Sequence, residues 1–221
     1  MKINHVKIYI ILCLSLSFDL STSVEDYYPK KLEPTNSNYG ITGILEMPNA
    51  RMMEEGSMKI GFSSSYPFEH TYITASPFSW LEASYKYTEQ KNLKYGPANY
   101  SGNQTRKDKG FDLKIRLFQE SYYMPEVAVG WNDLAGTGIF SSEYISATKR
   151  IKNADITIGY GWGILGQDKN ITNPFISISE RFKSRDNAVG QGGSFSKDAW
   201  FSGDDVSVFS GIEYYYQRYG I

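Results

Sequence analysis

Apolar and polar side chains alternate with a period of two in several segments of this chain. Residues 81–88 carry apolar side chains at odd positions and polar side chains at even positions. Residues 109–118 repeat the pattern, with apolar side chains at positions 111, 113, 115 and 117. Because successive side chains of a β-strand point to opposite faces, each segment is predicted to form a strand with one apolar and one polar face.

The same reading predicts strands along most of the chain and no helix with an apolar stripe after the N-terminal region. The further segments expected as strands are 39–46, 58–65, 68–76, 126–132, 143–149, 155–162, 175–182 and 206–217. Long polar loops are expected at 89–108 and 185–205. Alternating segments of about ten residues, separated by turns, are typical of outer-membrane barrels. The pattern therefore predicts an all-β, antiparallel, outer-membrane-type meander barrel of about 8–10 strands. It is either self-contained or the N-terminal part of a larger barrel.

The N-terminal region has the layout of a secretory signal peptide. Lys2 and Lys7 precede an apolar run over residues 8–18, which is too short to span a bilayer as a helix, and small polar residues follow it. We expect a signal peptide at 1–23, a polar lead at 24–38 and the barrel domain at 39–221. The only cysteine, Cys13, would be discarded with the signal peptide. A retained membrane anchor is the alternative.

Composition narrows the function classes. Lys and Arg number 23 against 24 Asp and Glu, so nothing favours a nucleic-acid partner. Aromatic residues make up 15% of the chain, which suits the interfacial girdles of a barrel. No Cys/His cluster or calcium-loop spacing predicts a metal site. Residues 161–166 match GxGxxG, but no helical pattern follows them, so we expect no dinucleotide and no other cofactor.

Several motifs resemble the YjbH-type exopolysaccharide biosynthesis proteins. The resemblance runs in order from about Asn38 to the C-terminus. It is carried by NYGITGILEMPNARM at 38–52 with EG at 55–56, SPFSWLE at 76–82, KDKGFD at 107–112, GTGIFSSEY at 136–144, residues 159–166 and FSKDAWF at 195–201. Two departures are visible: family members are typically several times longer, and many carry a lipid-modified cysteine.

The resemblance implies an outer-membrane barrel of a Gram-negative bacterium that assists biosynthesis or export of an extracellular polysaccharide without being an enzyme. Its partners would be outer-membrane lipid, the polysaccharide and polysaccharide-secretion proteins. Sugar chains offer C–H faces to aromatic rings and hydroxyls to polar groups. The candidate lumen or polysaccharide contacts are Lys86, Asp112, Lys114, Arg116, Trp200 and Phe201. The alternative is that the aromatic residues pack a loop or a membrane girdle, and that the charges pair with one another.

Two other function classes remain open. An outer-membrane hydrolase would use His70, the only histidine beyond the signal region. A soluble secreted β-sandwich or binding barrel would bury its apolar faces inward. The direction in which Leu81, Tyr85, Leu113 and Ile115 point separates this last class from a membrane barrel.

Overall fold

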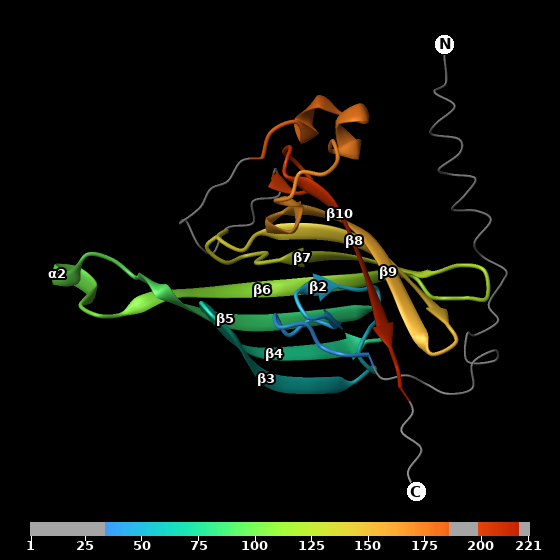
Figure 1. Cartoon of the computed structure of the whole chain (residues 1–221), viewed down its shortest axis with the longest axis horizontal. Helices are drawn as coiled ribbons and strands as arrows, with labels where there is room; N and C mark the ends of the chain where they lie inside the picture. The colour runs from blue at the N-terminus through green and yellow to red at the C-terminus, as the bar shows by residue number, and fades with distance from the viewer. Residues whose placement is uncertain (1–33, 186–198, 217–221) are drawn as a thin grey trace, which may run out of the picture.

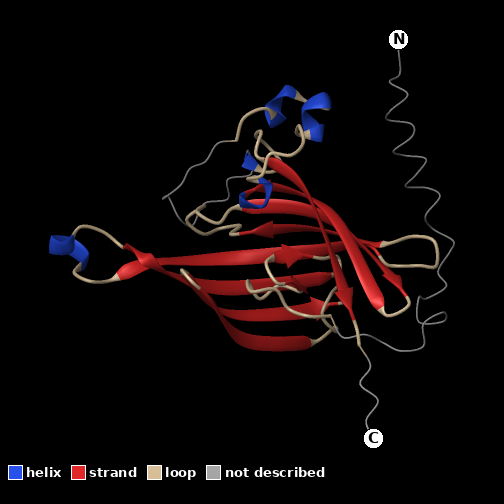
Figure 2. Cartoon of the chain, viewed as in Figure 1, coloured by secondary structure: helices blue, strands red, loops and turns tan. Residues whose placement is uncertain are grey.

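A computed structural model describes residues 34–185 and 199–216. These residues form an antiparallel sheet of eight strands, in which each strand pairs with the next along the chain. The sheet curls into a half-barrel with β3 and β10 at its edges (Figures 1 and 2). Its strands are β3 (Ser57–Ser65), β4 (Phe68–Phe78), β5 (Leu81–Lys94), β6 (Thr105–Phe118), β7 (Glu126–Asn132), β8 (Ser142–Ile151), β9 (Ala154–Gly163) and β10 (Val206–Tyr214). The prediction of an all-β antiparallel meander is therefore confirmed.

The apolar faces of the strands point outward and the polar faces point inward. On β3, Met58, Ile60 and Phe62 are 67%, 70% and 62% exposed. On the inner face, Glu82 of β5 and Lys114 of β6 have no exposed surface. The apolar residues singled out in the sequence follow the same rule, since Tyr85 is exposed, and Leu81, Leu113 and Ile115 are half-buried on the outer face. This is the reverse of a soluble sandwich, whose apolar faces meet in the interior.

The inner face is covered by residues 34–53, which we call the inner segment. It contains a hairpin of two short strands, β1 (Gly43–Ile44) and β2 (Met47–Pro48), which lies within the curl of the sheet (Figure 1). Gly40 allows the segment to approach β4, because its φ is +93° and a Cβ there would lie 2.4 Å from the ring of Tyr72. The sequence-based strand at 39–46 is therefore wrong in its extent. Only Gly43–Ile44 form a strand, next to an isolated bridge between Thr42 and Asn36, because this segment folds over the sheet without joining it.

Connections differ in length at the two ends of the sheet. At one end they are residues 79–80, 119–125 and 152–153. At the other end, the turn at 66–67 is short, but the remaining connections are longer. These are residues 95–104 with α2 (Ala98–Ser101), residues 133–141, and residues 164–205 with η2 (Ile164–Gly166), η3 (Pro174–Ser177) and η4 (Glu180–Phe182). We refer to these as the short-turn end and the long-loop end.

Three further predictions from the sequence are corrected by the structure. Residues 175–182 form the 3-10 turns η3 and η4 instead of a strand, because Pro174 and the Asn173 side chain, which accepts a hydrogen bond from the Phe175 amide, start a turn. Half of the expected loop at 89–108 is strand, since β5 and β6 stay paired as far as Lys94 and Thr105. Its polar composition reflects a hairpin exposed on both faces. The strand expected at 206–217 ends at Tyr214, and residues 217 onward lie outside the described ranges.

Candidate functional site

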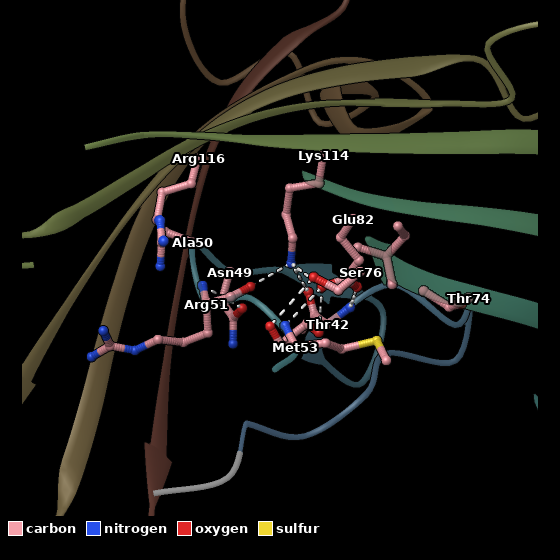
Figure 3. Close-up of polar contacts among 12 residues, drawn as sticks. Thr42, Asn49, Ala50, Arg51, Met53, Thr74, Ser76, Glu82, Lys114 and Arg116 are labelled. Carbon is pink, nitrogen blue, oxygen red and sulfur yellow. Dashed lines mark hydrogen bonds and ion pairs between the residues drawn. The ribbon is translucent and has the colours of Figure 1, made fainter. Parts of the chain in front are cut away.

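A buried ion pair on the inner face holds the inner segment by its backbone. Glu82 and Lys114 face each other across β5 and β6, with 3.6 Å between Nζ and Oε2. The Glu82 carboxylate accepts hydrogen bonds from the Thr42 amide at 2.6 Å, the Thr42 hydroxyl at 2.8 Å and the Met53 amide at 3.2 Å. Lys114 Nζ donates to the carbonyls of Thr42 at 3.0 Å and Arg51 at 2.5 Å (Figure 3). Two charges of the sheet thus satisfy backbone groups at both ends of the β1–β2 hairpin.

A second contact is made by Arg51, whose guanidinium reaches three carboxylates of the sheet and its loops. It forms a bidentate ion pair with Asp155 of β9, in which both N–O distances are 2.7 Å. Its Nη1 lies 2.7 Å from Glu126 of β7 and 2.6 Å from Glu120. Burial acts to lower the pKa of Arg51, but the hydrogen bond to Asp155 and the charges of Glu126, Asp155 and Glu120 outweigh it and raise that pKa. Arg51 is therefore a permanently charged anchor that joins residues 104 positions apart in the chain.

Nearer the long-loop end, the inner face carries a third polar group around Lys86. Lys86 pairs with Asp112 at 2.8 Å, and its ammonium lies 5.0 Å from the centre of the Tyr39 ring. Burial raises the pKa of Tyr39 to about 12, helped by the charges of Glu46 and Asp112. The other oxygen of Asp112 accepts a hydrogen bond from the Asp133 amide at 2.9 Å, which links the sheet to the loop at 133–141.

Asp133 is a buried carboxyl whose Oδ1 has no hydrogen-bond partner within the described residues. Its Oδ2 accepts a hydrogen bond from the Phe140 amide at 3.2 Å. Burial, together with the charges of Asp108 and Asp112, raises the pKa of Asp133 to about 7. Gly136 packs so closely over Oδ1 that a Cβ there would lie 1.6 Å from it.

The residues singled out from sequence separate into two groups. Lys86, Asp112, Lys114 and Arg116 lie on the inner face, where each is engaged with a carboxylate, a cation or the inner segment. Trp200 and Phe201 lie in the loop preceding β10 and pack on Trp131, with ring centroids 5.5 and 5.9 Å apart. These contacts are of the kind given as the alternative in the sequence analysis, in which the charges pair with one another and the aromatic residues pack a loop.

His70 is buried on the inner face of β4. Its Nδ1 lies 2.8 Å from the hydroxyl of Thr88, and its ring packs against Tyr39, Phe68 and Phe140. Within residues 34–185 and 199–216, no carboxylate is hydrogen-bonded to His70. The pair of a histidine base and a carboxylate that orients it, as found in many hydrolases, is therefore not formed there.

Sequence reasoning missed the residues that hold the inner segment: Thr42, Arg51, Glu120, Glu126 and Asp155. Glu82 stood on the predicted polar face, so alternation gave its direction but not its role. Arg51 stands in the NYGITGILEMPNARM motif, which was the one available signal for it.

Other kinds of site find little support in the part of the chain that the structure describes. It contains no group of three or more His, Cys, Asp or Glu side chains arranged to hold a metal ion. None of its helices has the length and apolar character needed to cross a membrane. The GxGxxG match at 161–166 ends β9 and continues into the three-residue turn η2, so no helix N-terminus is presented to a phosphate.

Comparison with known proteins agrees with the motifs. The model of the YjbH family, described as "Exopolysaccharide biosynthesis protein YbjH", matches residues 35–218. The "Uncharacterized lipoprotein YjbH" of Escherichia coli (strain K12) is 39% identical over 201 residues, which are 90% of this chain and 29% of the relative. This chain thus spans less than a third of the length of that relative. No solved structure matches the chain. The chain belongs to the YjbH exopolysaccharide biosynthesis family.

Proposed function

We propose that this chain forms part of the wall of an outer-membrane β-barrel that assists exopolysaccharide biosynthesis or export without catalysing a reaction. The observation that carries the proposal is the orientation of the strand faces. Large apolar side chains point outward on β3, β9 and β10, while Glu82 and Lys114 are fully buried inside. A protein surrounded by water gains nothing from this arrangement, whereas a barrel wall in lipid requires it.

The change from apolar to charged side chains along the outer face supports a membrane position. On β5 the outward side chains are apolar from Leu81 to Tyr87 and become charged at Glu89 and Lys91. Lys91 pairs there with Glu69 at 3.0 Å and with Glu89 at 3.4 Å. From residue 81 to residue 87 a strand rises about 20 Å at about 3.3 Å per residue, which is about 15 Å along the membrane normal at a tilt of about 40°. The apolar stretch of β5 therefore ends at charged residues, although it is shorter than the apolar band of outer-membrane barrels, which is about 25 Å tall.

The two ends of the sheet support an orientation. Outer-membrane barrels have short periplasmic turns and longer extracellular loops. The short-turn end, where Phe78 stacks on Trp80 at 5.5 Å, would face the periplasm. The long-loop end would face the outside. The signal peptide expected at residues 1–23 would deliver the chain to the envelope, and the inner segment would lie inside the barrel as a plug.

A role in polysaccharide handling is supported by family membership. Among the residues that the structure describes, His70 is hydrogen-bonded to the Thr88 hydroxyl and to no carboxylate, so its contacts give no support to the hydrolase alternative. In this proposal the lumen is lined by paired charges, and its polysaccharide and secretion-protein partners approach from its two ends.

The test combines genetics with fractionation in the native host. Deleting the gene is expected to lower extracellular polysaccharide, and restoring the full chain is expected to recover it. The protein itself is expected in the outer-membrane pellet after a carbonate wash. Unchanged polysaccharide in the deletion strain, or a chain recovered in the soluble fraction, would contradict the proposal.

A further inference from the structure

The β5–β6 hairpin extends well beyond its neighbours at the long-loop end. The pairing of β4 with β5 ends at Gln90, and β6 pairs with β7 only from Leu113 onward. The Lys91 amide makes the last contact with the rest of the sheet, to the Pro67 carbonyl at 2.8 Å. Residues 92–107, which we call the arm, project beyond the other strands with α2 at the tip (Figure 1).

The arm carries cations and no acidic residue. Its sixteen residues, NLKYGPANYSGNQTRK, include Lys94, Arg106 and Lys107, whereas the whole chain has a net charge of −1. Lys94 Nζ lies 3.3 Å from the Asn103 carbonyl and side-chain oxygens, so it is directed toward the tip. Neither Arg106 nor Lys107 forms an ion pair within residues 34–185 and 199–216. Two carboxylates lie at the base of the arm. Glu89 faces Lys107 across the strands but is bonded to Lys91 and Thr105, and Asp108 accepts hydrogen bonds from Thr137 and the Lys109 amide.

The remaining side chains of the arm are those that bind sugars. Tyr95 and Tyr100 are 54% and 79% exposed. Exposed amides surround them, at Asn92, Asn99, Asn103 and Gln104. Aromatic rings offer a face to the C–H groups of a sugar, amides bond its hydroxyls, and cations attract its carboxylates. Leu93, at 42%, is the other exposed large apolar side chain of the arm, so its exposed amides and its cations outnumber its large apolar side chains.

We propose that the arm is a binding site for an acidic polysaccharide, with Lys94, Arg106 and Lys107 contacting carboxylates and Tyr95 and Tyr100 contacting sugar rings. The inference rests on the proposed function, which places the long-loop end outside the cell. The arm then holds the polymer as it leaves the barrel. The attraction weakens as salt rises, because Lys94 is exposed and Arg106 and Lys107 are only half-buried.

The test measures binding by the full chain in detergent micelles. The probes are a fluorescent polyuronate, dextran of similar length as the neutral polymer, and polyglutamate as the acidic polymer without sugar rings. We expect Lys94→Gln/Arg106→Gln/Lys107→Gln to weaken polyuronate binding at least tenfold. The matched control, Lys152→Gln/Lys169→Gln/Lys183→Gln, removes three exposed cations elsewhere and is expected to stay within twofold. Tyr95→Ala/Tyr100→Ala is expected to weaken binding of polyuronate more than binding of polyglutamate.

Equal losses in the two triple variants, equal binding of dextran, or binding only to lipopolysaccharide vesicles would overturn the proposal. Equal effects of the tyrosine changes on polyuronate and polyglutamate would also overturn it. These outcomes remove the arm as a polysaccharide site and leave the proposed function standing if the deletion strain still loses extracellular polysaccharide. An unchanged deletion strain removes the proposed function whatever the arm binds.

Discussion

At the scale of single residues, the inner face contains buried charges that are paired across β5 and β6, as in Glu82 with Lys114 and Lys86 with Asp112. An isolated charge in such a place would be strongly unfavourable, so its partners determine whether the fold is stable. Lys114 has a carboxylate 3.6 Å away and two backbone carbonyls within 3.0 Å, and Glu82 accepts three hydrogen bonds from the inner segment. The pair therefore connects the sheet to the segment that covers it.

Replacing Lys114 by Met should destabilise the protein by about 3–5 kcal/mol, because Glu82 is then left as an uncompensated buried charge. The double variant Glu82→Gln/Lys114→Met should lose less stability than the two single variants lose together, since no lone charge of the pair remains. Urea unfolding in detergent micelles measures both losses. Lys183→Met, at a side chain that is 60% exposed, is the control and should change stability by no more than about 0.5 kcal/mol. A Lys114→Met loss no larger than this control would contradict the assigned role.

Asp133 predicts a dependence of stability on pH. Its pKa is raised from 3.8 to about 7 in the folded protein, so the folded state binds the proton more tightly than the unfolded state. The resulting stabilisation is full below pH 3.8, and it is lost as the pH rises toward about 7.

Asp133→Asn should remove this loss, because the amide stays neutral and Asn tolerates the left-handed backbone at this position, where φ is 57°. Thermal unfolding should show that the stability of the variant, relative to that of the native protein, is higher at pH 8 than at pH 5. Asp168→Asn, at an exposed loop residue, should show no such gain. A gain for Asp133→Asn that is the same at both pH values would contradict the assignment.

Alternation in the sequence predicts which side chains share the inner face, but not what they contact. Lys86, Asp112 and Lys114 follow from the period of two alone. Arg51 does not, because it lies in a segment without strand periodicity and its partner Asp155 is 104 residues away. Long-range pairs of this kind depend on how the chain folds back into the curl, and a single sequence carries no local signal for that.

At the scale of elements, the inner segment and the sheet meet through polar contacts. Thr42, Ala50 and Met53 donate their amides to side chains of the sheet, and Arg51 supplies its guanidinium. Both surfaces can therefore be hydrated when they separate. These polar contacts act beside apolar ones, since Ile41 is buried and Tyr39 packs against His70.

Arg51→Leu should loosen the inner segment while the sheet stays folded. Three buried carboxylates lose their common cation, whereas the strand pairing does not involve Arg51. Hydrogen exchange should become at least about tenfold faster for the amides of Thr42 and Ala50, and it should stay unchanged for β8 and β9. Arg181→Leu, at an exposed residue of η4, provides the comparison. Equal protection of the inner segment in native protein and Arg51→Leu would contradict this picture.

Most strands could be predicted from the sequence because one of their faces is apolar. β3, β4, β8 and β9 begin and end within two residues of the expected positions. The pattern fails where both faces of a hairpin are exposed, as in the outer part of β5 and β6, since no apolar positions mark the pairing. It also fails at 175–182, where apolar residues fill an aromatic cluster: Phe175 stacks on Trp162 at 5.3 Å and packs against Phe201 at 5.7 Å.

At the scale of the whole molecule, the account depends on the environment of the outer face. Exposed apolar residues lie on the outer face at both edges of the sheet, with Ile60 of β3 at 70% exposure and Ile158 of β9 and Ile212 of β10 at 57% and 67%. A half-barrel of this kind has edges at β3 and β10, and the E. coli relative is more than three times as long as the matched region. Unpaired strand edges are unfavourable in lipid, so we expect both edges to be covered in the working assembly.

The most direct measurement is the accessibility of spin labels on the outer face in lipid vesicles. Single cysteines replace Ile60 and Ile158 in a Cys13→Ser background, with Lys183→Cys as the label exposed to water. We predict that the labels at 60 and 158 collide with dissolved oxygen and not with a water-soluble nickel reagent, while the label at 183 collides with the nickel reagent. Labels at 60 and 158 that collide with the nickel reagent as often as the label at 183 would contradict the central claim.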